Sequence, residues 1–216
     1  MNEDILNSIL ENKIIAIVRG VESEKCMKVA EALYAGGIRL LEITYNQSAP
    51  DSWEKTAEAI KAIAAAFQGR MYVGAGTVTN THLVELTAQA DGRYIISPNV
   101  NTDVIRRTKD LNMVSIPGAM TPTEILTAHD AGADFVKLFP AANLGISYLK
   151  AIRSPINHVK LLATGGINEA NAKAFIDAGS AGLGVGGGLA NKKAIAEGNY
   201  HELTIAAEKL IAAIKQ

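Results

Sequence analysis

Residues 24–37 read EKCMKVAEALYAGG, and LLEIT follows at residues 40–44. In the first segment, apolar residues recur at spacings of three and four, which predicts a helix with one buried face. Glycine stands where such a helix would end. The second segment is a short aliphatic run that is typical of a buried strand. The stretch therefore predicts a unit of helix, glycine and strand.

This unit recurs along the chain, for example in EANAKAFIDAGSAG at residues 169–182. Strands are predicted at residues 14–18, 40–44, 71–76, 94–97, 113–118, 135–139, 160–164 and 182–186. Strands that alternate with helices form a parallel sheet, and eight of them in 216 residues predict one (β/α)8 TIM-barrel domain over residues 1–216. An open doubly wound sheet needs fewer strands, and the glycine run at residues 182–190 comes too late for a dinucleotide fingerprint.

The composition excludes several classes of partner. Lys and Arg number 21 against 22 for Asp and Glu, so no field of one sign is available to hold nucleic acid or a membrane surface. The single cysteine, Cys26, cannot form an internal disulfide, and the four histidines lack the spacing of metal ligands. The N-terminal segment does not resemble a signal peptide. We expect a soluble cytoplasmic protein that binds neither nucleic acid nor membranes.

A lysine lies inside an apolar strand, in the stretch DFVKLFP at residues 134–140. Because side chains alternate along a strand, Lys137 points into the barrel if its aliphatic neighbours face the helices. The same parity turns Glu42, in the strand at residues 40–44, toward the interior. Moving an isolated charge from water into a protein interior costs on the order of several kcal/mol. Buried charged residues therefore tend to form ion pairs, to have shifted pKa values, or to take part in catalysis.

Two interpretations of this pair follow. Lys137 and Glu42 could form a structural ion pair. Alternatively, burial lowers the pKa of Lys137, and its amine forms a Schiff base with a ketone while Glu42 transfers protons. The second interpretation is favoured because charges inside barrels cluster where catalysis occurs.

Polar residues at the carboxyl ends of the strands are the next candidates, since barrel active sites lie there. Arg19 follows the first strand and could clamp a substrate carboxylate, or it could be a surface residue. Thr77 follows the third strand and could donate a hydrogen bond there, or cap a helix beginning near Asn80.

Two glycine-rich segments follow the last two predicted strands, ATGGIN at residues 163–168 and GVGGGLAN at residues 184–191. In barrels these two loops often bind phosphate through backbone N–H groups. Their glycines could instead serve only tight turns and close packing. Two such runs at this pair of positions favour an anion site.

Six segments together resemble a known family: GGIRLLEITYN, VGAGTV, YIISPNV, SIPGAMTPTE, FVKLFPA and ATGGIN. In this order and spacing they are similar to the 2-keto-3-deoxy-6-phosphogluconate and 4-hydroxy-2-oxoglutarate aldolases, with their 2-keto-3-deoxy-6-phosphogalactonate relatives. The resemblance implies that Lys137 is the Schiff-base lysine, that Glu42 is the acid/base residue, and that the protein is a homotrimer. The other implied residues bind the substrate, at its carboxylate (Arg19, Thr77), along the pocket wall (Pro98, Phe139) and at its phosphate (Thr164, Gly165, Gly166, Gly186, Gly187).

Two departures from the family pattern bear on the substrate. Several gluconate-type members carry an arginine shortly after the glutamate strand, where this chain has Asn46. Asn46 and the following Trp53 look more like the galactonate-type branch, which leaves the C4 stereochemistry open. Gly187 stands where the family often has a serine, so one hydroxyl donor to a phosphate is missing.

The resemblance implies a class I aldolase that cleaves a 2-keto-3-deoxy-6-phospho sugar acid to pyruvate and glyceraldehyde 3-phosphate. A second implied substrate is 4-hydroxy-2-oxoglutarate, which gives pyruvate and glyoxylate. Such a reaction requires no metal and no organic cofactor. Two other functions stay open: a phosphosugar epimerase or decarboxylase in which Lys137 is only an electrostatic stabiliser, and a non-catalytic phosphosugar-binding barrel.

Overall fold

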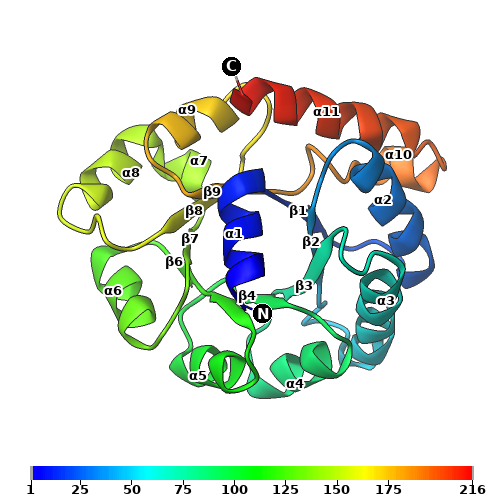
Figure 1. Cartoon of the computed structure of the whole chain (residues 1–216), viewed down its shortest axis with the longest axis horizontal. Coiled ribbons are helices and arrows are strands. Elements are labelled where there is room, and N and C mark those ends of the chain that lie inside the picture. The colour runs from blue at the N-terminus through cyan, green and yellow to red at the C-terminus, as the bar shows by residue number, and fades with distance from the viewer. Residues whose placement is uncertain (1, 216) are drawn as a thin grey trace.

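The computed structural model describes residues 2–215, and its strands form one parallel sheet in the order β5-β4-β3-β2-β1-β9-β8-β7-β6. The strands are β1 (Ile14–Val18), β2 (Leu40–Thr44), β3 (Tyr72–Gly76), β4 (Tyr94–Ile96), β5 (Val114–Ile116), β6 (Gly118–Ala119), β7 (Val136–Leu138), β8 (Leu161–Thr164) and β9 (Gly182–Val185). Figure 1 looks down the ring that they form.

The ring closes at Pro117, which divides one predicted strand into β5 and β6. Proline has no backbone N–H to donate to a neighbouring strand, so the regular strand is interrupted at this residue. Its carbonyl still accepts a hydrogen bond from the backbone N–H of Lys137 at 2.8 Å, which joins this strand to β7. Because β5 and β6 are two parts of one strand, the nine segments correspond to the eight strands of a barrel. The prediction of a (β/α)8 barrel is confirmed.

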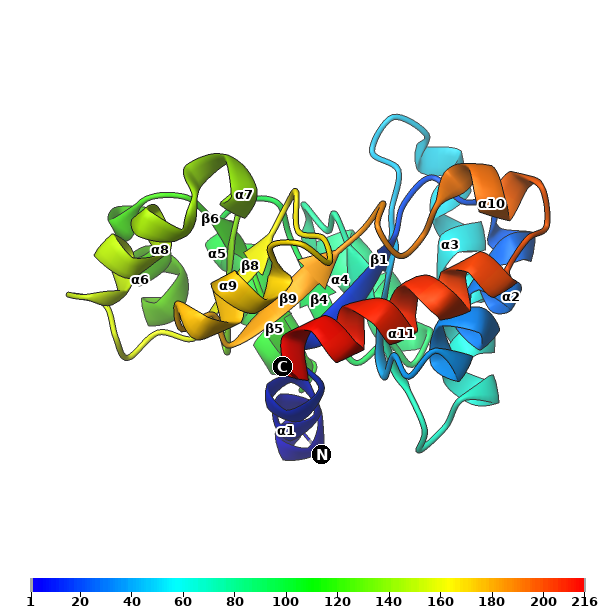
Figure 2. The same cartoon turned by 90° about the horizontal axis from the view of Figure 1, so that it is seen from above.

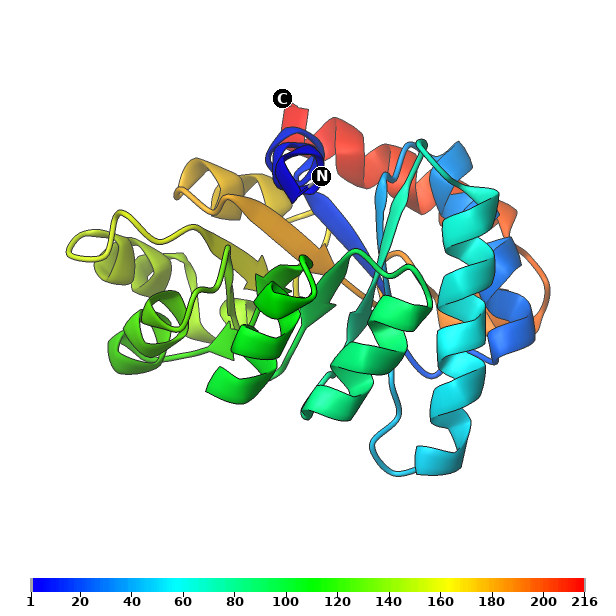
Figure 3. The same ribbon diagram turned by 60° about the horizontal axis from the view of Figure 1, so that its bottom comes forward.

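Helices surround the sheet on its outer side (Figures 1 and 3). They are α2 (Ser23–Ala35), α3 (Trp53–Ala66), α4 (Thr81–Gln89), α5 (Thr102–Asp110), α6 (Pro122–Asp130), α7 (Ala141–Leu144), α8 (Ile146–Arg153), α9 (Ala172–Asp177), α10 (Lys192–Ala196) and α11 (His201–Lys215), with a 3-10 turn η1 (Pro50–Ser52) before α3. A glycine ends α2 as predicted, and it is needed there for packing: a Cβ on Gly36 would strike the backbone of Thr204 on α11. None of the helices within residues 2–215 combines the length and the apolar content that crossing a bilayer requires.

An additional helix, α1 (Asn2–Asn12), closes the end of the barrel opposite the β2–α3 loop (Figure 2). This helix was not predicted from the sequence. Ile5 and Ile9 on one face of α1 are buried in a cluster with inward-facing strand residues. The strand members of this cluster are Ile15, Leu40, Tyr94, Ile96, Val114, Ile116, Phe135 and Leu162. The lower part of the barrel interior is therefore filled mainly by apolar side chains and is sealed by α1.

Truncation of the α1 plug tests this arrangement. Ile9 is 1 % exposed, so Ile9→Ala should lower the free energy of unfolding by about 2–5 kcal/mol through lost burial and an unfilled cavity. Urea denaturation gives this value. Asn7→Ala, on the exposed side of the same helix, is the control and should change it by no more than about 0.5 kcal/mol. Equal small effects would show that α1 contributes little to the core.

Candidate active site

Glu42 and Lys137 face the interior from β2 and β7, as strand parity predicts. Glu42 is 0 % exposed and Lys137 is 5 % exposed. Their neighbours Leu41, Ile43 and Val136 belong to the separate outer core between the strands and the helices. Two oppositely charged side chains therefore lie in the upper part of an otherwise apolar interior.

The pKa shifts of Glu42 and Lys137 both favour the neutral form of the group. Burial raises the pKa of the Glu42 carboxyl, and the positive charges of Lys137 and Arg19 only partly offset it. Burial also lowers the pKa of the Lys137 amine, against the attraction of Glu42, and Arg19 lowers it further. Desolvation of the charged form is the dominant cause in each case.

No direct ion pair offsets this cost. Within residues 2–215, none of the carboxylate and cation pairs closer than 4.0 Å includes Glu42 or Lys137. Both carboxylate oxygens of Glu42 also lack a hydrogen-bond partner among the residues that the structure describes. Glu42 and Lys137 therefore do not form a direct ion pair among the residues that the structure describes, and their catalytic role stays a prediction. A buried polar group without a protein partner needs another explanation, and a role in catalysis is a recognised one.

Glycine at position 76 makes room for the carboxyl group of Glu42. A Cβ on Gly76 of β3 would overlap the Oε1 atom of Glu42. Any larger residue would push the carboxyl out of its place. Gly76 was not among the predicted site residues, although it lies in the segment VGAGTV.

Arg19 and Thr77 meet at the rim, beyond β1 and β3. The guanidinium of Arg19 donates a hydrogen bond to the Thr77 hydroxyl at 3.0 Å. Thr77 does not cap α4, because Asn80 does so by accepting from the N–H of Leu83 at 3.0 Å. Thr77 instead has a left-handed backbone with φ 58°, which is uncommon for a residue with a side chain.

Gln47 holds this rim in place, and the sequence analysis missed it. Its amide donates to the Thr77 carbonyl at 2.8 Å and accepts from the Thr79 hydroxyl at 2.9 Å. Arg19, Thr77 and Gln47 also line a cleft of about 660 Å³ between the loops after β1 and β2. This rim therefore presents one cation and several polar groups beside the barrel mouth.

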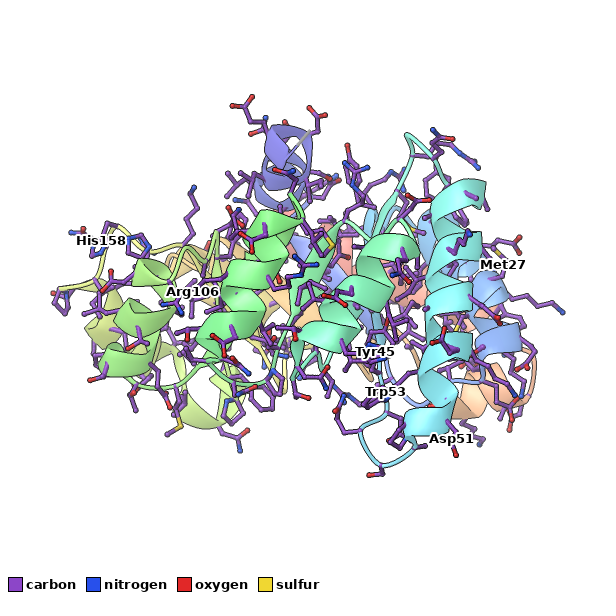
Figure 4. The ribbon with its side chains drawn as sticks, turned by 90° about the horizontal axis from the view of Figure 1, so that it is seen from below. Met27, Tyr45, Asp51, Trp53, Arg106 and His158 are labelled. Carbon is purple, nitrogen blue, oxygen red and sulfur yellow. The ribbon has the colours of Figure 1, made fainter. Side chains whose placement is uncertain are left out.

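The β2–α3 segment forms the outer side of the cleft and projects from the barrel (Figure 3). Asn46 accepts a hydrogen bond from the N–H of Ser48 through its side chain, at 3.0 Å. Trp53 donates its indole N–H to the Asn46 carbonyl at 2.9 Å. Trp53 and Asp51 lie at this end of α3 in Figure 4. The loop is therefore ordered without an arginine.

Phe139 and Pro98 flank the mouth on the side of β7. The ring centroid of Phe139 is 5.0 Å from the Lys137 ammonium nitrogen, and 39 % of the residue is exposed. The same ring packs against Gly165 in the loop after β8. Pro98 is exposed, and its backbone packs against Gly118 of β6. Phe139 therefore lies beside the lysine at an open entrance.

The two glycine-rich loops follow neighbouring strands, β8 and β9. Thr164 is 5 % exposed, and its side chain lies against Gly184 across this strand pair. Gly165 and Gly166 have left-handed φ values of 94° and 72°, so these two positions favour glycine. Tight turns therefore explain part of the glycine content.

Gly187 differs from the other two glycines. Its φ is not in the left-handed region, and a Cβ there would meet nothing within 4 Å. Gly186, beside it, lies near the carbonyl of Ile17 on β1. The backbone at Gly187 is therefore open to solvent and would accept a side chain. Across the residues that the structure describes, three or more His, Cys, Asp or Glu side chains do not gather anywhere as a metal-binding group.

Comparison with known proteins places this arrangement in a family. The family model described as KDPG and KHG aldolase matches residues 5–206. The chain belongs to this aldolase family. The prediction made from the sequence motifs is confirmed, and the protein is an aldolase, a class of lyase.

Three relatives of this chain illustrate the range of the family. A probable 2-dehydro-3-deoxy-6-phosphogalactonate aldolase of Rhizobium meliloti is 37% identical over 91% of this chain and 90% of its own length. A solved native KDPGal structure superposes with a TM-score of 0.84 at 32% identity, covering 94% of both chains. The KDPG aldolase of Legionella pneumophila, solved with pyruvate as a covalent carbinolamine intermediate, has a TM-score of 0.84 at 28% identity over 94% of this chain and 96% of its own.

Because the Glu42 carboxyl is buried without an ion-pair partner among residues 2–215, replacing it with a neutral group should increase the stability of the folded protein. A carboxyl whose pKa is raised by folding destabilises the fold above that pKa, where it is ionised, and this cost shrinks as the pH falls from that pKa toward the ordinary pKa of the group. Glu42→Gln should therefore raise the melting temperature near pH 8, by about 2–4 °C for each kcal/mol gained. Thermal unfolding monitored between about pH 5 and 8 measures this, and the difference should narrow toward the acidic end.

Glu58→Gln is the control for this experiment, because Glu58 is exposed on α3. It should leave the melting temperature unchanged over the same pH range. A Glu42→Gln protein that is less stable than the unaltered protein at about pH 8 would show that the ionised carboxylate has a stabilising partner.

Proposed function

We propose that this protein is a Schiff-base aldolase that releases pyruvate from a 2-keto-3-deoxy-6-phospho sugar acid. The observation that carries the proposal is the setting of Lys137, an amine that is almost fully buried, has a lowered pKa, and forms no ion pair within 4.0 Å among residues 2–215. A larger share of such an amine is neutral near pH 7 than of an ordinary lysine, and the neutral amine is the nucleophile. The covalent carbinolamine of the Legionella pneumophila relative supports the same chemistry here.

In the proposed cycle Lys137 is the nucleophile. Its amine attacks the C2 ketone to give a carbinolamine, and loss of water leaves a protonated imine, the iminium ion. The iminium withdraws electrons from C3, so the C3–C4 bond can break and leave an enamine on the lysine. Glyceraldehyde 3-phosphate departs from the C4 side. Protonation of the enamine at C3 and hydrolysis of the iminium release pyruvate and restore the amine.

Glu42 performs the proton transfers in this cycle. As a carboxylate it accepts the C4 hydroxyl proton during bond cleavage, and it then returns a proton to C3 of the enamine. Its raised pKa suits both steps, because a group that accepts and donates in turn works best when its pKa lies near the working pH. No protein group within residues 2–215 hydrogen-bonds to its carboxylate oxygens, so an oxygen is available to the substrate.

Groups suited to binding a substrate follow several of the strands around this pair. Arg19, aligned by Thr77, is placed to bind the substrate carboxylate through a charge-assisted hydrogen bond. Pro98 and Phe139 form the apolar wall. We assign the phosphate to the loops after β8 and β9, at Thr164, Gly165, Gly166, Gly186 and Gly187, whose backbone N–H groups suit an anion.

The galactonate-type C4 epimer is the substrate favoured by this chain. Asn46, in a loop held by Trp53, stands where several gluconate-type members have an arginine. The relative from Rhizobium meliloti, at 37% identity, has the corresponding galactonate name. Steady-state pyruvate release from the two C4 epimers tests this choice, and equal kcat/KM values would leave the enzyme without a preference.

Assembly into a homo-oligomer is a further part of the proposal. A cube-shaped protein cage designed by fusing symmetric oligomeric domains contains a region that matches 94% of this chain at 32% identity. Light scattering on the purified protein measures the oligomeric state directly.

Trapping the iminium tests the central step. Pyruvate with borohydride should abolish activity and leave a reduced adduct on Lys137, which peptide mass spectrometry locates. Lys137→Arg keeps the positive charge but removes the amine, so it should lower kcat by at least about a thousandfold while the protein stays folded. Lys160→Arg is the matched control, on an exposed lysine just before β8, and should be trapped like the unaltered protein.

Activity that survives pyruvate and borohydride would exclude the Schiff-base mechanism. Turnover of a phosphosugar without any adduct would instead identify an epimerase or decarboxylase that uses Glu42 as a base. Phosphosugar binding without turnover would identify a binding protein.

The phosphate assignment predicts that kcat/KM is higher for the phosphorylated substrate than for its unphosphorylated counterpart. Gly187→Ser should widen this preference by up to about tenfold, because the position has an ordinary φ and free space for a hydroxyl donor. Thr164→Ala should narrow it. Gly188→Ser is the matched control, since this loop position also has an ordinary φ and room for a Cβ, and it should leave the preference unchanged.

Equal kcat/KM values for the two substrates in the unaltered protein would contradict a phosphate site. They would point to an unphosphorylated substrate such as 4-hydroxy-2-oxoglutarate.

A further inference from the structure

Tyr94 of β4 lies inside the barrel, one layer below the carboxyl group of Glu42. Its ring packs against Gly74 of β3, where a Cβ would overlap it, while the Glu42 carboxyl lies against Gly76. The two glycines are two residues apart on the same face of β3, which corresponds to about 7 Å along a strand. β2 runs alongside, with Glu42 opposite Gly74. The phenol and the carboxyl are therefore neighbours across β3.

The Tyr94 hydroxyl shares an unusual property with the Glu42 carboxyl. Among residues 2–215, the buried side-chain polar atoms without a hydrogen-bond partner are Oε1 and Oε2 of Glu42 and the hydroxyl of Tyr94. The backbone of Leu41 on β2 is near enough to act on the phenol but does not meet hydrogen-bond geometry. A phenylalanine would fill the same space without the cost of burying an unpaired hydroxyl. Because these two unpaired polar groups lie in the same barrel interior, each is a candidate hydrogen-bonding partner for the other.

We infer that Tyr94 is a positioning residue for proton transfer at Glu42, and that its hydroxyl donates a hydrogen bond to the Glu42 carboxylate through one buried water molecule. A water is required because no direct hydrogen bond joins the two groups. The inference rests on the proposed aldolase reaction, in which Glu42 exchanges protons with the substrate.

The phenol acts only as a donor at working pH. Burial and the negative charge of Glu42 raise the pKa of Tyr94 well above its ordinary value, so the hydroxyl stays protonated. A donor stabilises the ionised form of the carboxyl and lowers its pKa, against the effect of burial. Lys137 and Arg19, the charged groups that act on Glu42, lower it too. Loss of the phenol should therefore raise the pKa of Glu42.

Tyr94→Phe tests the inference, with Tyr72→Phe on β3 as the matched control. Deuterium exchange at the methyl group of pyruvate reports proton transfer to and from the enamine, whereas borohydride trapping reports only formation of the iminium. Tyr94→Phe should slow exchange about tenfold and leave trapping unchanged, since a hydrogen bond to a charged group has roughly this effect. The acidic limb of kcat/KM should move up by about one pH unit. Tyr72→Phe should alter none of these.

A second experiment separates positioning from packing. In a Glu42→Gln background, Tyr94→Phe should have no further effect on exchange, because the group that it serves is absent. A high-resolution crystal structure of the unaltered protein should show one ordered water between the phenol and the carboxyl group.

Several results would overturn the inference while leaving the aldolase reaction intact. These are normal exchange and an unchanged pH profile in folded Tyr94→Phe, an equal loss of trapping and exchange, an additional loss in the Glu42→Gln background, or the absence of the water. Failure of the unaltered protein to form an iminium would instead overturn the proposed function itself.

Discussion

Burial of a carboxyl group and an amine in the same barrel interior, without a direct ion pair, is the constraint on which the rest of the site depends. Each charged form loses its hydration, and the Coulombic attraction between Glu42 and Lys137 only partly compensates for this loss. Such a site can persist only where the surrounding structure is stable enough to hold it. The apolar layer beneath it, closed by α1, and the outer layer of helices provide that stability.

The barrel architecture produces this setting with few special residues. Parity along β2 and β7 turns one residue of each strand inward, and the apolar residues that follow the opposite parity pack against the helices. Glycine on β3 then creates space at two levels, Gly74 for the ring of Tyr94 and Gly76 for the carboxyl of Glu42. Small residues on one strand thus determine where large polar side chains of its neighbours can lie.

The sequence predicts those features that depend on local pattern. Alternation along a strand is sufficient to turn Lys137 inward, and the repeat of strand, helix and glycine is sufficient to predict the barrel. Contacts between distant segments were missed, among them the bonds of Gln47 to the loop after β3 and the approach of Tyr94 to Glu42. These depend on how neighbouring strands align, which no short stretch encodes. The helix α1 was not predicted, although Ile5 and Ile9 have helical spacing, because this short segment precedes the first strand and lies outside the repeat of strand and helix.

In the proposed reaction, the effect of the Arg19 charge on Lys137 differs before and after the substrate binds. In the free protein its positive charge lowers the pKa of Lys137, which favours the neutral amine needed for attack on a ketone. Once a substrate carboxylate binds to the guanidinium, that charge is largely compensated. The iminium cation that then forms on Lys137 would no longer be repelled, and the carboxylate of Glu42 would stabilise it. Binding of an anionic substrate would therefore change the field at the lysine from one that favours the nucleophile to one that favours the cationic intermediate.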